Sequence, residues 1–79
     1  MEERIIVDSE ILAGKPIIKG TRISVEFILE LLAADLSVDD ILREYPHLTK
    51  EDVLAALEYA TKVLRHEEIY LLASTAVSA

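Results

Sequence analysis

One helix-start signal occurs three times from residue 23 onward and limits what this chain can fold into. The segments ISVEFI, LSVDDI and LTKEDV each place a Ser or Thr where its side chain can accept a hydrogen bond from a first-turn backbone N–H. An acid follows in the first turn, near the positive end of the helix dipole, and apolar residues flank the cap. The repeat predicts three helices, at residues 24–35, 37–45 and 49–67.

The pattern changes before Ser24. Residues 5–7 (IIV) and 16–18 (PII) are short β-prone runs separated by polar residues and a glycine, so two short strands are expected. Residues 8–13 are expected to form one helical turn capped by Asp8. The predicted fold class is mainly α: a three-helix, helix-turn-helix-like domain with a short N-terminal β segment.

Seventy-nine residues support a single domain, placed at residues 1–70, followed by an apolar and small-residue tail at 71–79 that can be flexible. The N-terminus has no signal-peptide pattern, and no apolar run approaches the ~20 residues that span a bilayer. We therefore expect a cytoplasmic protein without membrane contact.

No chemistry-bearing cluster stands out. The chain has no cysteine, and its only histidines, His47 and His66, fall in different elements without a metal-ligand spacing. We expect no metal, no cofactor, no catalytic residue and no enzymatic activity.

Helical periodicity predicts which faces are buried. The helix at 49–67 should turn one stripe inward, comprising Val53, Ala56, Leu57, Ala60 and Leu64. The helix at 24–35 carries a second apolar strip, with Phe27 and Leu31, opposite its main one. Either the N-terminal strands or a partner subunit must cover that strip, and the small core favours a homodimer.

Three cations gather in the segment GKPIIKGTRI, residues 14–23, although the net charge is −7. Lys15, Lys19 and Arg22 have no acid between them, and Arg22 precedes a helix N-cap, where an anion can be held. These residues are candidate DNA contacts. An equally weighted interpretation is that the glycines serve turns and the cations are solvated or paired with nearby acids.

The helices at 37–45 and 49–67 have the lengths of a helix-turn-helix. Lys50, at the start of the second, is a further candidate DNA contact. Glu51 and Asp52 stand where base-reading helices usually offer Arg, Asn, Gln or Lys, and complementarity to the helix dipole explains these acids more simply.

Four consecutive apolar residues follow the predicted third helix. They form either a frayed terminus or an arm that orders against a partner. The second interpretation makes them candidate partner-binding residues, together with Phe27 and Leu31: Ile69, Tyr70, Leu71 and Leu72.

Two segments, GKPIIKGTRISV and YPHLTKEDVLAALEYA, resemble the prokaryotic family known as domain of unknown function 433, over about residues 5–68. The resemblance implies a compact helix-turn-helix-like domain and, by genomic association, an antitoxin encoded beside a PIN-like ribonuclease toxin. We therefore expect an antitoxin or transcriptional regulator that binds a PIN-like toxin and operator DNA. The alternative is a protein–protein interaction module without DNA binding.

Overall fold

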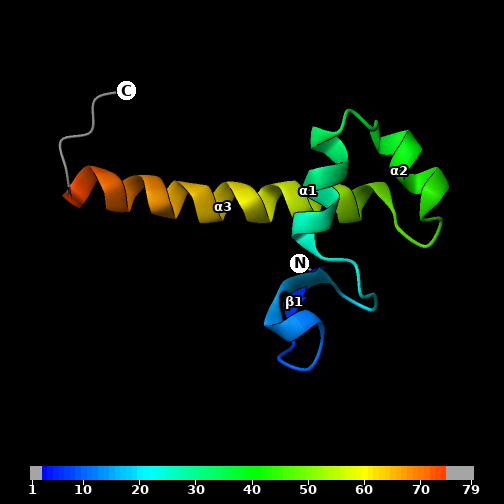
Figure 1. Cartoon of the computed structure of the whole chain (residues 1–79), viewed down its shortest axis with the longest axis horizontal. Helices are drawn as coiled ribbons and strands as arrows, with labels where there is room; N and C mark the ends of the chain where they lie inside the picture. The colour runs from blue at the N-terminus through cyan, green and yellow to red at the C-terminus, as the bar shows by residue number, and fades with distance from the viewer. Residues whose placement is uncertain (1–2, 75–79) are drawn as a thin grey trace.

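The computed structural model describes the backbone of residues 3–74 and the side chains of residues 3–66. Three helices and a two-stranded sheet confirm the predicted fold class (Figure 1). Among the described residues, no helix is both long and apolar enough to cross a bilayer. The elements are β1 (Ile5–Val7), a 3-10 turn η1 (Leu12–Gly14), β2 (Pro16–Ile18), α1 (Val25–Ala33), α2 (Val38–Glu44) and α3 (Lys50–Ser74).

The two strands pair antiparallel at the predicted residues. The backbone N–H of Lys19 donates to the carbonyl of Arg4 at 2.7 Å, just beyond the paired strands. Hydrogen-bonded and non-bonded pairs alternate in such a ladder, so the backbone groups of Ile5 and Val7 point away from β2. The register is Ile5↔Ile18, Ile6↔Ile17 and Val7↔Pro16.

The connection between the strands differs from the expected turn at 8–13. The 3-10 turn begins only at Leu12, and its N-cap residue, Ile11, provides no side-chain cap. Asp8 instead accepts a hydrogen bond from the backbone N–H of Glu10 at 2.9 Å. This contact is a local Asx turn, which satisfies the Asp8 carboxylate before any helix begins.

All three predicted helix starts act as caps. Ser24 accepts a first-turn backbone N–H of α1 at 2.9 Å. Ser37 and Asp40 form a reciprocal capping box at the start of α2, and Thr49 and Asp52 form the same arrangement at α3.

One small core lies where β2, α1 and α2 meet the first half of α3. Each of these elements contributes at least one fully buried side chain, so the elements stabilise one another. The largest of these side chains are Ile17, Ile18, Ile28, Ile41 and Val53.

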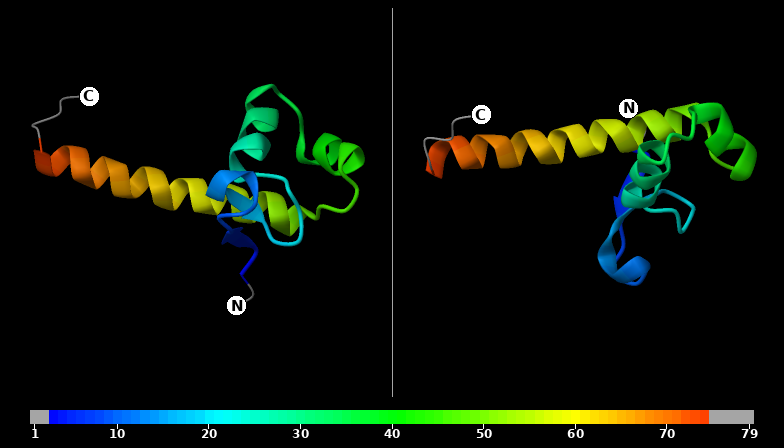
Figure 2. Two further views of the ribbon diagram at one scale, coloured as in Figure 1. Left: turned by 60° about the horizontal axis from the view of Figure 1, so that its bottom comes forward. Right: turned by 45° about the horizontal axis from the view of Figure 1, so that its top comes forward.

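α3 is much longer than the body against which it packs. Its 25 residues span about 37 Å at 1.5 Å per residue, and its distal half extends away from the other elements (Figures 1 and 2). We call residues 61–74 the overhang. Leu64, which was predicted to face inward, is 63% exposed because the body ends near Ala60. Leu57, for which the same was predicted, is 39% exposed although it precedes that point.

Candidate functional site

The basic segment forms β2 and the loop that leads into α1. Gly14 and Gly20 adopt φ values of +81° and +83°, in the left-handed region that glycine tolerates best. The Thr21 hydroxyl donates to the Ile18 carbonyl at 2.8 Å and accepts from the Ile23 N–H at 2.9 Å. The predicted turn role of both glycines is therefore confirmed.

The three cations of this segment have different surroundings. Lys15 Nζ lies 2.9 Å from Glu26 Oε1, and its hydrogen bond with that carboxylate raises the pKa of Lys15 above its usual value. Lys19 and Arg22 are exposed and form no ion pair within the described part of the chain. Glu26 and Glu30 line the same hollow of about 540 Å³ as Lys15 and Arg22. The segment is acid-free in sequence but has acids beside it in space.

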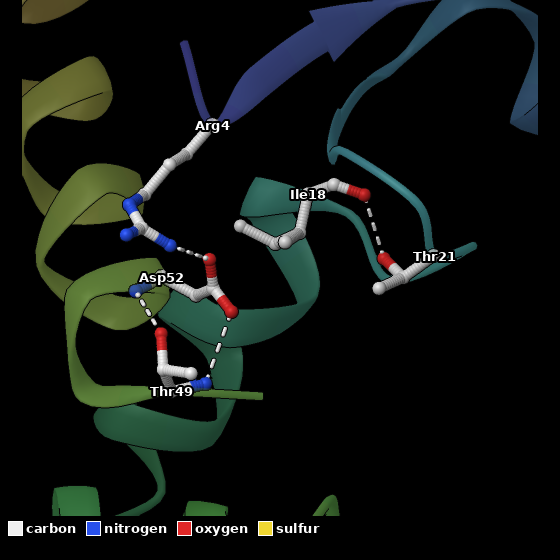
Figure 3. A network of polar contacts seen from close by, with 5 residues as sticks. All are labelled: Arg4, Ile18, Thr21, Thr49 and Asp52. Carbon is white, nitrogen blue, oxygen red and sulfur yellow. Dashed lines mark hydrogen bonds and ion pairs between the residues drawn. The ribbon is translucent and has the colours of Figure 1, made fainter. Parts of the chain in front are cut away.

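An ion pair that was not predicted joins the residue before β1 to the start of α3 (Figure 3). Arg4 Nη1 lies 3.0 Å from Asp52 Oδ1, and Asp52 is only 8% exposed. The other carboxylate oxygen accepts the Thr49 N–H at 3.0 Å. Because the Arg4 carbonyl also accepts the Lys19 N–H, the loop that carries Lys19 adjoins the first turn of α3.

The start of α3 is less acidic at the surface than its sequence indicates. Lys50 and Glu51 are exposed, whereas Asp52 is buried against Arg4. The structure thus places two candidate DNA contacts, Lys19 and Lys50, on adjoining elements.

The second apolar strip of α1 packs against its own chain. The Phe27 ring meets Tyr45, the C-cap residue of α2, edge to face, with centroids 5.7 Å apart and an interplanar angle of 85°. Leu31 packs against the core, and both side chains are half-buried. The end of α2 therefore covers Phe27, whereas the prediction named the N-terminal strands or a partner subunit.

An apolar notch opens where α3 leaves α1, and we call it the α1–α3 notch. It measures about 330 Å³, and among the described residues the Lys15–Glu26 ion pair forms its only charged lining. Sequence periodicity could not reveal it, because Leu64 follows the same stripe as the buried residues. The apolar lining consists of Pro16, Val25, Leu29, Tyr59, Ala60, Val63 and Leu64.

A second hollow, of about 700 Å³, lies between β1 and α3, and we call it the β1–α3 hollow. His47 and His66 are exposed and do not line it. Within residues that the structure describes, no group of three or more His, Cys, Asp or Glu residues could hold a metal ion. The hollow is lined by apolar Ile5, Leu54 and Ala55, by aromatic Tyr59 and by five residues with acidic or basic side chains, Glu3, Arg4, Glu51, Glu58 and Lys62.

The candidate partner-binding residues near the C-terminus belong to α3, whose backbone continues to Ser74, past the predicted end at 67. Their side chains lie outside the described residues: Ile69, Tyr70, Leu71 and Leu72.

Comparison with known proteins places this arrangement in context. A family model described as "Protein of unknown function (DUF433)" matches residues 5–60. An uncharacterized protein from Archaeoglobus fulgidus is 62% identical over 24 residues, covering 30% of this chain and 67% of that protein. The crystal structure of a DUF433 member protein from Anabaena variabilis has a TM-score of 0.75 at 25% identity, covering 87% of this chain and 68% of that one. The family match ends at residue 60, where the overhang begins.

Proposed function

The chain belongs to the DUF433 family of proteins of unknown function, and we propose that it is a cytoplasmic, non-enzymatic antitoxin that binds a PIN-like ribonuclease toxin. The observation that carries the proposal is the overhang, with the α1–α3 notch at its base. Val63 and Leu64 are 44% and 63% exposed there, although burying such side chains is favourable by about 1.5–3 kcal/mol. An amphipathic helix of this kind suits insertion into an apolar groove of a partner.

The class of partner comes from the family resemblance, which associates such chains with PIN-like toxins. Residues 69–72 form a second apolar run on the same helix, after the polar residues 65–68, so the proposed contact extends along the overhang. The proposed antitoxin is a homodimer, because one core of this size leaves much apolar surface for a second copy to cover.

Capture of the neighbouring gene product by the tagged chain tests this function, with ribonuclease inhibition as the second readout. Replacing Val63 and Leu64 together by Asp should abolish capture without lowering the thermal midpoint, because both side chains are already exposed. Ser9→Asp with His47→Asp adds the same charge to exposed positions outside the overhang and the notch and should retain capture. Undiminished capture by the variant with Asp at positions 63 and 64 would refute binding through the overhang.

Operator DNA is the second ligand that we propose, and the Arg4–Asp52 pair favours it. This pair turns one acid inward and leaves Lys19 and Lys50 exposed on adjoining elements, with Arg22 on the same loop. Lys15 is the least suited of the four candidates, because it already pairs with Glu26.

Salt titration of binding to DNA from the protein's own promoter tests this second ligand. Each phosphate contact contributes about −0.9 to the slope of log K against log salt, so replacing Lys19, Arg22 and Lys50 by Ala should flatten the slope by about 2.7 per subunit. Undetectable binding at low salt would leave the alternative function, an interaction module without DNA binding.

A further inference from the structure

We propose that the outer edge of β1 and the β1–α3 hollow bind an extended, cationic segment of a partner protein. The segment would pair with β1 as an added strand and place alternate side chains in the hollow. This surface shares Tyr59, but no other described residue, with the α1–α3 notch, and the inference does not depend on the toxin proposal.

The edge of β1 is available for pairing. Within the described chain the sheet has two strands, and the backbone groups of Ile5 and Val7 point away from β2. The edge of β2 that faces away from β1 already forms a hydrogen bond within the chain, since the Ile18 N–H donates to the Ile23 carbonyl at 2.9 Å. Exposed edges are usually protected by charge or proline, but β1 is uniformly apolar and Val7 is 62% exposed. Such an edge favours strand addition.

The hollow beside this edge supplies an apolar floor. Ile5 and Tyr59 are half-buried, and Leu54 of α3 is 49% exposed. Successive side chains of a strand point to opposite faces, so an added strand would direct every second side chain toward this floor.

The rim of the hollow determines the charge of the occupant. Three carboxylates line it, from Glu3, Glu51 and Glu58. Arg4 already forms an ion pair with Asp52, with 3.0 Å between Nη1 and Oδ1. Lys62 is the remaining cation, so the lining is negative overall. A second copy would bring the same carboxylates to this edge in a chain of net charge −7, which disfavours self-pairing here. A cationic strand is the complementary occupant.

Fluorescence anisotropy with labelled synthetic peptides and the full chain tests this inference. A short peptide of alternating lysine and valine should bind, and its affinity should fall as ionic strength rises and screens the carboxylates. A matched peptide of alternating glutamate and valine should not bind. Equal affinity for the two peptides, or no binding of the lysine peptide, would overturn the proposal.

Two variants separate the backbone contribution from the charge contribution. Val7→Pro removes an outward N–H without breaking a bond to β2. Without the hydrogen bond from this N–H to the peptide, the affinity for the lysine peptide should be about tenfold lower than that of Val7→Ala. Glu51→Gln with Glu58→Gln should also lower the affinity for the lysine peptide.

The matched control for the charge variant replaces Glu10 and Glu44, exposed residues outside the hollow, by Gln and should leave affinity unchanged. Circular dichroism verifies that each variant is folded; should Val7→Pro unfold, the charge variants decide alone. Affinity unaffected by the Glu51 and Glu58 changes would refute the proposed rim. Toxin capture, which depends on Val63 and Leu64, is a separate measurement.

Discussion

Replacing Asp52 by Ala should destabilise the protein more than its position in the first turn of a helix suggests. The change removes the acceptor of the Thr49 N–H, a capping contact of about 0.5–2 kcal/mol. It also removes the partner of Arg4, whose charge-assisted bond we set near 1 kcal/mol because the Arg4 side chain is 36% exposed. The sum is about 1.5–3 kcal/mol, a large part of the roughly 4–12 kcal/mol expected for a domain of this size.

Thermal unfolding followed by circular dichroism measures this loss, which corresponds to a fall in midpoint of about 6–24 °C. Asp40→Ala is the matched control, since Asp40 occupies the same capping-box position in α2 but is more exposed. An Asp52→Ala midpoint no lower than that of Asp40→Ala would refute the reasoning. A double-mutant cycle with Arg4→Met should give a coupling of about 1 kcal/mol, and strict additivity would show that the ion pair contributes nothing.

Three further changes test other parts of the molecule. Gly20→Ala should cost about 1 kcal/mol in urea unfolding because its φ is +83°, although no atom obstructs the added methyl; an unchanged midpoint would contradict this. The Ser37 backbone N–H lowers the pKa of Asp40 from 3.8, so Asp40→Asn should be less stable at neutral pH. That deficit should fade as the pH falls from 3.8 through the lowered folded-state pKa, and a pH-independent deficit would exclude this cause. Phe27→Asp with Leu31→Asp should unfold the chain, because both pack within it; a folded monomer by sedimentation would instead assign them to a dimer interface.

Local interactions made much of the fold predictable. Each helix cap joins a side chain to a backbone N–H three residues away. The capping role of Ser24, Ser37 and Thr49 could therefore be predicted from the residues next to them in the sequence. The strands at residues 5–7 and 16–18 were predictable from their β-prone composition and the turn residues between them.

Long-range contacts were not predictable in this way. Arg4 and Asp52 are 48 positions apart, and nothing in either neighbourhood indicates the other. Pairing of the basic segment with nearby acids was one of its two interpretations and is confirmed for Lys15, but the choice of Glu26 as its partner depends on how β2 is oriented against α1. The α1–α3 notch was missed because an apolar stripe repeats in the same way whether or not the body reaches far enough to cover it.

The overhang also divides one helix into regions of different local stability. Val53 and Ala56 are fully buried, whereas residues 61–66 are exposed and depend mainly on their own backbone hydrogen bonds. Short helices without tertiary contacts are marginal in water, so amide hydrogen exchange should quicken along α3 beyond Ala60. A partner that binds this region must also supply the free energy that keeps it helical. Raising helix propensity at an exposed position such as Thr61 should therefore strengthen binding without any new contact.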